Sequence, residues 1–520
     1  MFNIILEKTH NFFTKHNWLK KILLGLLLFV VIWICYDVLV PYSLYPNDNF
    51  QTIRTVMIIP PCICLALGCY WFGKKELNVE RLALLLMIAG FSLRIGYAFY
   101  TGADTRQHDV EMWTQGKLNI DGAGHFAYTN ILYTTMKLPE TVRWQFYHPP
   151  FWHFLVAIWM HIYSFFTGVK DVGMLYEAGM ILSSFVGCLT LIGFKKLLFS
   201  LTKNNKVRII ALLILCFHSQ FFIQSSWMNN DGLSLMFSVF SLYFGLRFHQ
   251  ARKWKDIILC ALSLGLGAMT KVSIALMCIP LAMLFIYDFV IDIKDGKWKR
   301  IILQYITFIG ICAPLALWFI IRNITLFGIE SIGVPYIDPN TNMGVINYTL
   351  WERFGIPDLT KLNESIFCII WKNQNGYHDY NVWLYTLKCS VLGEYSYWQG
   401  ATFINGLLLF NGLMIVYSLY CMVYTIIHEW KKKDYINLVM VVIFFVNIIS
   451  YIIFQVTYPV ICTQDFRYMT MILLPGAYFV GKHYDNIDNG SKLSPFRKAI
   501  SLLFIIGFAL SSILTFISVR

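Results

Sequence analysis

The sequence predicts an all-α polytopic membrane protein with about 13 transmembrane helices of roughly 20 residues each. Of its 520 residues, 57% are hydrophobic and only 14% are charged, and the mean hydropathy is +0.58. One aqueous core cannot bury that much apolar surface, so lipid must surround much of the chain. The formal charge of +13 comes from short basic clusters between apolar runs. That pattern is typical of cytoplasmic loops and argues against nucleic acid as a partner.

The first three apolar runs set the orientation of the chain. Runs long enough to span a bilayer occur near 20–40, 52–72 and 82–100. The first run has the look of an export signal, but it is long and lacks a small-residue cleavage site, so we expect a retained helix. Lysines precede the first run and basic residues follow the second, whereas the connection PYSLYPNDNF has neither lysine nor arginine. The positive-inside rule therefore places the N-terminus in the cytoplasm and the loop 101–149 outside.

Two later apolar runs are not expected to be ordinary spans. If 150–166 crossed the membrane, the basic cluster at 195–208 would lie outside, so we expect a helix lying in or dipping into the outer leaflet. The run 256–290 is too long for one span and holds Lys271 near its middle. Two short helices with an outward turn at Thr270 and Lys271 would keep this lysine out of hydrocarbon.

With this topology, charged residues of distant segments gather on the outer side. Charged groups close to hydrocarbon are costly, so such a cluster usually marks a site. A base beside cations that grip a phosphate is the pairing needed to transfer a group from a phosphorylated donor. Groups that could accept a proton are Asp104, His108, Asp109, Glu111 and His148, and cations that could hold an anion are Lys271, Arg322 and Arg467.

Each of these residues also has a purely structural interpretation, although the conjunction of all of them on one face is stronger evidence than any single member. The alternatives are helix capping for Asp104 and Asp231, salt bridges of Asp109 with Arg106 and of Arg467 with Asp465, contact of Lys271 and Arg322 with lipid headgroups, and a backbone hydrogen bond for His148.

Five motifs follow one another in a recognisable order. They are Arg94 in the third apolar run, then QHDVE, YHPPFWHFLVA, SSWMNNDGLSLMF and LGLGAMTKVS. In this order they resemble the polyprenyl-phosphate-dependent glycosyltransferases of the GT-C superfamily, most closely the protein mannosyltransferase and aminoarabinose transferase branch. The resemblance covers 94–322, and beyond that mainly the topology. One departure is the valine inside the acidic pair of QHDVE, where the family has adjacent acids.

The resemblance implies a GT-C-like bundle with juxtamembrane helices in the first large outer loop. It implies a sugar donor on a polyprenyl phosphate, a glycan, lipid or protein acceptor, and transfer, commonly with inversion, on the outer face of a multi-pass plasma-membrane protein. The resemblance requires no cofactor. The scattered acids could meet around one divalent cation, although no spacing demands it, so a divalent cation stays open. The implied catalytic base is Asp109, with Asp104 next, and the implied substrate-binding residues are His108, Glu111, His148, Asp231, Lys271, Arg322 and Arg467.

The chain shows no internal repeat or low-complexity linker that would separate independent domains. The later outer loop, 323–402, is rich in tryptophan, which suits either sugar rings or an interfacial aromatic belt. The cysteines lie mostly in apolar runs without a CxxC pair, so neither disulfides nor zinc are expected. The predicted units are 1–80, an N-terminal helix pair; 81–322, the catalytic module with its outer loop 101–149; 323–402, an outer loop on the acceptor side; and 403–520, the C-terminal transmembrane helices.

Two other functional classes compete with a glycosyltransferase. A transporter or lipid-linked sugar flippase would be expected to show repeats, interrupted helices and charges near the middle of the membrane. A scaffold or sensor would bind a wall polymer without a reaction. The sequence has no Walker or Rossmann glycine pattern, which favours a lipid-linked donor over a nucleotide sugar.

Overall fold

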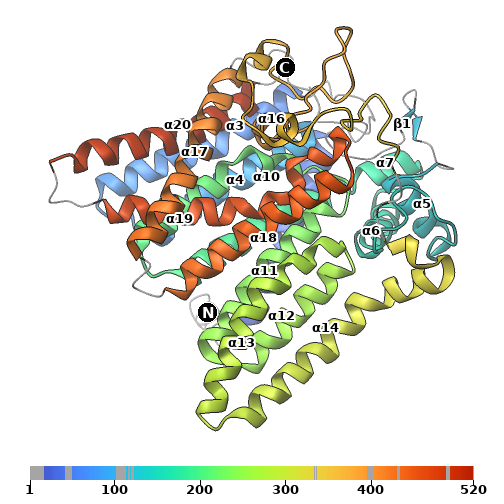
Figure 1. The fold of residues 1–520 in the computed structure, drawn as a ribbon, viewed down its shortest axis with the longest axis horizontal. Helices are drawn as coiled ribbons and strands as arrows, with labels where there is room; N and C mark the ends of the chain where they lie inside the picture. The colour runs from blue at the N-terminus through green and yellow to red at the C-terminus, as the bar shows by residue number, and fades with distance from the viewer. Residues whose placement is uncertain are drawn as a thin grey trace, which may run out of the picture.

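The structure is a computed structural model that describes residues 17–40, 50–100, 113–114, 117–118, 122–332, 334, 337–394, 403–429, 434–487 and 492–518. It confirms the predicted all-α architecture (Figure 1). In the described part, nine helices are long and apolar enough to cross a membrane, and shorter helices pack between them. The total of 13 spans stays a prediction. One short antiparallel hairpin joins β1 (Trp113–Thr114) to β2 (Lys117–Leu118).

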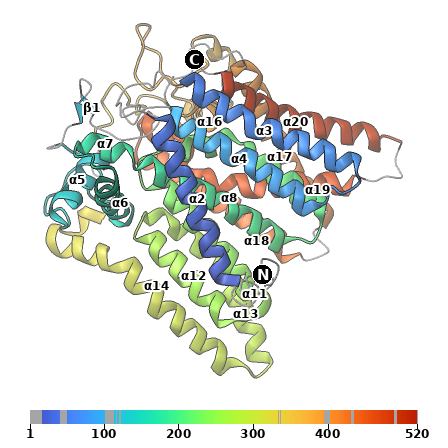
Figure 2. The same ribbon diagram turned by 180° about the vertical axis from the view of Figure 1, so that it is seen from behind.

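The three N-terminal runs form helices where the sequence predicts them. They are α2 (Asn17–Leu39), α3 (Phe50–Gly73) and α4 (Val79–Tyr100). α3 packs along α4, and α2 lies against α8 (Met180–Leu201), as Figure 2 shows from behind. Many leucine, isoleucine and valine side chains of α2 and α3 are exposed, which is expected of helices that face lipid.

Arg94 of α4 is fully buried and fixes a break between two helices. α9 (Asn205–Phe217) ends inside the bundle, and α10 (Ser219–Gln224) begins two residues later. The last carbonyls of a helix lack partners within it. The guanidinium of Arg94 donates to the carbonyls of Leu215 at 3.0 Å and Cys216 at 2.9 Å. A cation at the negative end of the helix dipole is also favourable.

The run around Lys271 is divided as the sequence predicts. α11 (Asp231–Ala251) leads to α12 (Trp254–Ala268), which ends at a turn, and the short helix η2 (Val272–Met277) continues into α13 (Cys278–Lys294). α14 (Trp298–Phe327) packs along α12 and α13. In Figure 1 these four helices run toward the bottom of the view, away from the C-terminal helices.

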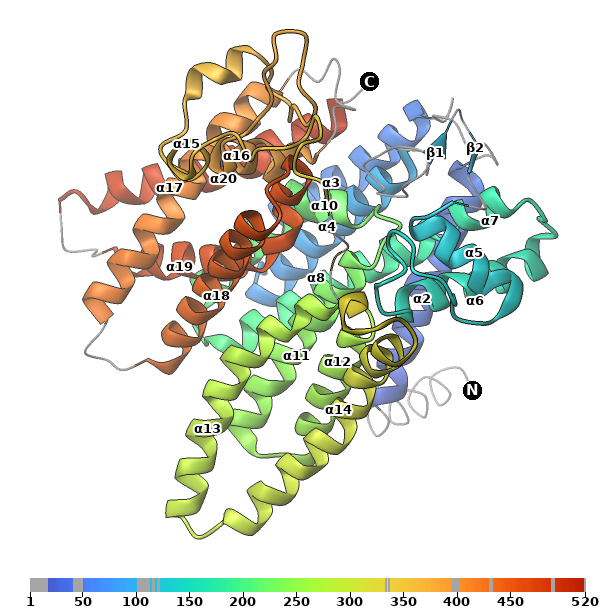
Figure 3. The same ribbon diagram turned by 45° about the vertical axis from the view of Figure 1, so that its right-hand side comes forward.

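The segment between α4 and α8 forms a compact group of short helices. α5 (His125–Thr135) packs on α6 (Phe151–Thr167), which contacts α7 (Val172–Glu177), and Figure 3 shows this group beside one end of α14. α6 is the predicted helix after the two prolines. It buries Trp152, Val156 and Tyr163, and it exposes Phe165 and Phe166, as expected for a helix that lies against lipid.

The stretch after α14 forms a small module, which we call the outer module (337–394), and it shares a hydrophobic core with residues of the C-terminal half such as Tyr451 and Phe466. Lys388 and Asp379 are both fully buried in it and pair at 2.9 Å, and Asp379 also accepts from the hydroxyl of Tyr377. A buried ion pair is tolerated only when further hydrogen bonds satisfy it. The helices here are α15 (Leu350–Phe354), η4 (Leu359–Asn363) and α16 (Val382–Leu392), and η3 (Ile329–Ile332) precedes the module.

The C-terminal helices cover the other side of α9 and support the outer module. A β-bridge between Gly344 and Val460 joins this module to the segment after α18. α17 packs on α19 and α20, and α19 packs on α9. The elements are α17 (Ile404–Glu429), α18 (Tyr435–Thr457), η6 (Ile461–Gln464), η7 (Phe466–Ile472), α19 (Leu473–Asn486) and α20 (Ser494–Ser518).

Replacement of Arg94 by leucine is expected to destabilise the protein. It would leave the carbonyls of Leu215 and Cys216 without a donor in an apolar interior, at about 1–3 kcal/mol each. Thermal unfolding in detergent measures the loss. The matched control is Arg81→Leu, because Arg81 is exposed and its pair with Glu76 should contribute at most about 1 kcal/mol. Equal unfolding temperatures for the two variants would contradict this role of Arg94.

Candidate functional site

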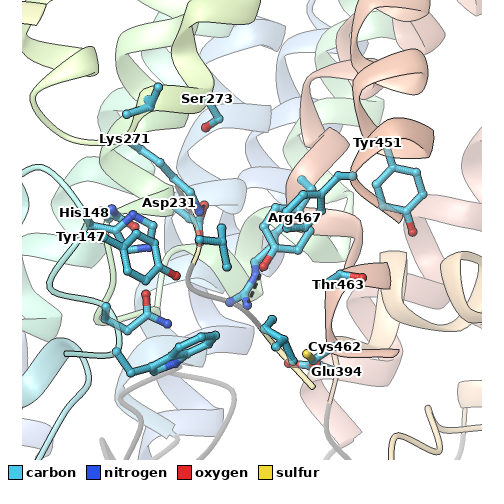
Figure 4. Close-up of a pocket in the computed structure, with 18 of the residues that line it drawn as sticks. Tyr147, His148, Asp231, Lys271, Ser273, Glu394, Tyr451, Cys462, Thr463 and Arg467 are labelled. Carbon is cyan, nitrogen blue, oxygen red and sulfur yellow. Dashed lines mark hydrogen bonds and ion pairs between the residues drawn. The ribbon is translucent and has the colours of Figure 1, made fainter. Parts of the chain in front are cut away.

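A cavity of about 510 Å³ lies where distant segments that the sequence predicts to face outward meet (Figure 4). The sequence predicts that His148, Asp231, Lys271 and Arg467 face outward together, and all four line this cavity. Apolar residues complete the wall, among them Leu276, Val334 and Phe454. A cavity lined by both charged and apolar side chains suits an amphiphilic ligand.

The turn between α12 and η2 holds the first three of these residues together. The backbone N–H of Phe151, at the start of α6, donates to the carbonyl of Met269 at 3.0 Å. The side-chain amide of Asn230 donates to the carbonyl of Thr270 at 2.9 Å. Two segments that are far apart in sequence are therefore tied to the residues directly before Lys271.

Lys271 and Asp231 form an ion pair at the edge of the cavity. The ammonium group donates to Oδ1 of Asp231, and both side chains are about nine-tenths buried. The backbone N–H of Asp231 donates to the side chain of Asn229 at 2.9 Å, which fixes the start of α11. The predicted capping role of Asp231 is therefore filled in part by its neighbour, and its carboxylate faces Lys271.

Arg467 approaches the same place from the C-terminal half. Asp465 caps η7 by accepting from the backbone N–H of Arg467 at 2.9 Å, and its Oδ2 lies 3.4 Å from Nε of Arg467. The guanidinium lies 5.1 Å from the ring centre of Tyr468, and the ammonium of Lys271 lies 5.4 Å from the same ring. Burial raises the pKa of Tyr468 well above its usual value, so this phenol stays neutral beside the two cations.

Two histidines, His125 and His148, line the cavity, and His153 lies behind His125. Nδ1 of His125 lies 2.9 Å from Nε2 of His153, and the ring of His148 stacks on His125 at 5.8 Å. The pKa of His148 is well below its usual value, first because the ring is buried and then because Lys271 is close. His148 is therefore a neutral ring that can exchange one hydrogen bond with a ligand.

Sequence reasoning missed several lining residues, of which His125, Glu394 and Tyr468 carry ionisable groups. Glu394 lies two residues after the end of α16, and its Oε1 accepts from the hydroxyl of Tyr385 at 3.5 Å. In the sequence, Glu394 stands out only as an acid within the predicted outer loop 323–402. Trp371, in the loop predicted for the acceptor side, also lines the cavity.

Arg322 lies outside this cavity. Its guanidinium donates to the carbonyl of Pro139 at 2.8 Å and to the side chain of Asn323 at 3.0 Å. It thereby ties the last turn of α14 to the loop that leads to His148. These contacts hold the side chain of Arg322 between the two segments, and its substrate-binding role stays a prediction.

The proposed base and its neighbours belong to a part of the chain that the structure does not describe. The residues concerned are Asp104, His108, Asp109 and Glu111. Among the described residues, no three histidine, cysteine or acidic side chains gather in a way that could hold a metal ion. The acids of the first outer loop are not part of that statement, so a divalent cation stays open.

Residues 147–324 match the family model of dolichyl-phosphate-mannose-protein mannosyltransferases. The match includes His148, Asp231 and Lys271, and it confirms the predicted resemblance to GT-C glycosyltransferases over about a third of the chain. No curated protein matches the chain by sequence.

Solved structures of one archaeal enzyme resemble this chain. The oligosaccharyltransferase AglB of Archaeoglobus fulgidus, in complex with an inhibitory peptide and a dolichol-phosphate, is 13% identical with a TM-score of 0.47, over 84% of this chain. The same enzyme tethered to an acceptor peptide is 12% identical with a TM-score of 0.47, over 86% of this chain. The alignment spans 55% of each of those longer chains. This likeness is too distant for a transfer of function.

Replacement of His148 by glutamine is expected to reduce the acid sensitivity of the protein. Because the folded-state pKa lies below the unfolded value of 6.5, only the unfolded state gains this proton as the pH falls. The free energy of unfolding is therefore highest above pH 6.5 and falls below it, by about 1 kcal/mol between pH 6.5 and 5.5. Unfolding temperatures at these two values measure the loss, with the exposed His161→Gln as control. An unchanged pH dependence in His148→Gln would contradict the assignment.

Proposed function

We propose that this membrane glycosyltransferase transfers a sugar from a polyprenyl-phosphate donor to an envelope glycan, lipid or protein acceptor. The observation that carries the proposal is the pair of cations, Lys271 and Arg467, both close to the ring of Tyr468 in a cavity with apolar walls. Cations suit a phosphate, and apolar walls suit the isoprenoid chain. The family that matches 147–324 is named for a dolichyl-phosphate sugar donor, which is the same chemical class.

The reaction we infer is a displacement at the anomeric carbon. The acceptor hydroxyl loses its proton to a base and forms the new bond to carbon, while the bond from this carbon to the phosphate oxygen breaks. The leaving polyprenyl phosphate takes the electron pair, and Lys271 and Arg467 stabilise its added charge. We assign the base to Asp109, with Asp104 as the next candidate, in the first outer loop.

The ion pair of Lys271 with Asp231 prepares the site for the exchange of one anion for another. An arriving phosphate can replace the carboxylate as the partner of the ammonium group, so Lys271 never stays buried without a counter-charge. Asp231 is then released toward the sugar, whose hydroxyl groups it can hold. His148, neutral and beside Lys271, supplies a further hydrogen bond to the phosphate or the sugar.

The acceptor is proposed to enter beside the outer module. Trp371 of this module lines the cavity, and Trp351 lies exposed on its surface. Aromatic faces suit the C–H surfaces of sugar rings as well as apolar peptide or lipid groups. We place this side on the outer face of the plasma membrane, because the basic connections then lie in the cytoplasm.

Replacement of Asp109 by asparagine is expected to lower turnover by about 100-fold or more, because a general base is lost. The test is complementation of a deletion strain, with mass spectrometry of envelope glycans and lipid-linked sugars. The variant should be expressed normally, accumulate a polyprenyl-phosphate sugar and lack one glycan residue. Glu76→Gln, an exposed acid in the turn after α3, is the control. Full activity of Asp109→Asn would instead favour a flippase or scaffold.

Removal of the Lys271–Asp231 pair is expected to weaken phosphate binding by about tenfold or more. The double variant Lys271→Met/Asp231→Asn avoids leaving a buried carboxylate without a partner. Binding of geranyl phosphate, a short isoprenyl phosphate, to the purified full-length protein measures the effect. The matched control is Lys297→Met/Asp295→Asn, an exposed pair in the turn between α13 and α14. If both double variants bound the probe as the wild type does, the phosphate site would lie elsewhere.

A further inference from the structure

Two cysteines of the outer module lie side by side. The thiols of Cys368 and Cys389 are close enough to interact through their side chains. Cys389 belongs to α16 and is fully buried, whereas Cys368, in the preceding loop, is only partly buried. Sγ of Cys368 lies 4.0 Å from the carbonyl oxygen of Tyr385. In an α-helix this carbonyl faces the residue one turn later, which is Cys389.

We propose that Cys368 and Cys389 form a reversible disulfide and that its formation strengthens the ion pair between Asp465 and Arg467. The pair differs from the other cysteines of the described chain, most of which lie in apolar helices. Its place in the outer module, on the non-cytoplasmic side of the proposed topology, is where disulfides form and persist. The effect on Arg467 rests on the proposed function, whereas the disulfide does not.

The oxidant required is the disulfide of a thiol–disulfide oxidoreductase. Cys368, the more exposed thiol, attacks it first and forms a mixed disulfide, and one thiol of the oxidoreductase leaves with a proton. Cys389 then attacks the sulfur of Cys368 and releases the second thiol, again with a proton. Two cysteine thiols are oxidised to one disulfide, and two electrons reduce the oxidoreductase disulfide to a dithiol.

The link to the cavity runs through one hydrogen bond. In the dithiol state, the thiol of Cys389 donates to Oδ1 of Asp465 at 3.3 Å. Oδ1 also accepts from the backbone N–H of Arg467, and Oδ2 faces its guanidinium. Oxidation removes the thiol hydrogen, so Asp465 loses one donor and depends more on Arg467. A tighter pair with Asp465 leaves Arg467 less available to an anionic ligand.

Disulfide mapping tests the first half of the proposal. The full-length protein in detergent is treated with oxidised glutathione or with a reductant, then alkylated, digested and analysed by mass spectrometry. We expect a linked peptide pair that joins Cys368 to Cys389 after oxidation, with the loss of two hydrogens and reversal by the reductant. The control Cys462→Ser, in the cavity wall, should give the same link. Separate alkylation of both residues, or a link to another cysteine, would overturn the proposal.

Binding of geranyl phosphate tests the second half. We expect its Kd to be about tenfold higher for the oxidised than for the reduced protein, and to be unaffected by oxidation in Cys368→Ser. Cys368 is the residue to replace, because substitution of the buried Cys389 risks misfolding. Equal affinities of a mapped disulfide form and the reduced form would overturn the link to Arg467. Absence of binding in both forms would contradict the proposed function and the link together, while the mapping still decides the disulfide.

Discussion

The cavity depends on the short turn that ends α12. The carbonyls of Met269 and Thr270 accept hydrogen bonds from Phe151 and Asn230, so the start of α6 and the start of α11 are held at fixed positions beside Lys271. Backbone carbonyls buried at a helix end need donors, and here the donors come from other segments of the site. The same contacts that satisfy the end of α12 therefore bring His148 and Asp231 to the cavity. Arg94 acts similarly within the helix bundle. It donates hydrogen bonds to the last carbonyls of α9 and so fixes the path of the chain toward Asp231.

Charge balance in the cavity explains how a charged ligand can enter an apolar environment. Each of the two cations already has a carboxylate, Asp231 for Lys271 and Asp465 for Arg467. Removal of a counter-charge from a buried ion is expensive, but replacement of one anion by another is not. A phosphate can therefore take the place of a carboxylate without leaving the cation unpaired, while the released carboxylate turns to the hydroxyl groups of the sugar. The neutral state of His148 fits this balance, since a third positive charge beside Lys271 would have no partner.

The sequence was sufficient for the features that depend on hydropathy and on the position of charges. The N-terminal helices, the division of the run at Lys271 and the meeting of His148, Asp231, Lys271 and Arg467 all follow from the rule that charges avoid hydrocarbon. Features that depend on contacts between distant segments were not predictable in this way. Neither the bond of Arg322 to Pro139 nor the approach of Cys368 to Cys389 leaves a local pattern, and the expectation of no disulfide came from the apolar surroundings of the other cysteines. The break between α9 and α10 was missed for the same reason, because its hydrogen-bond donor, Arg94, is contributed by another helix.

The two halves of the cavity are attached to the rest of the protein in different ways. His148, Asp231 and Lys271 belong to one network around the turn after α12, whereas Arg467 shares a segment with the supports of the outer module. The bridge from Gly344 to Val460 and the bond from the hydroxyl of Tyr451 to the carbonyl of Gln464, at 2.6 Å, hold that second half together. Between the halves, the described contacts include the bond of Gln224 to Thr470 at 2.8 Å and the approach of Arg467 to the ring of Trp227. A ligand whose phosphate binds Lys271 and Arg467 at once would add a strong contact across this boundary. Binding of the donor would therefore fix the distance between the outer module, where we place the acceptor, and the residues that hold the leaving group.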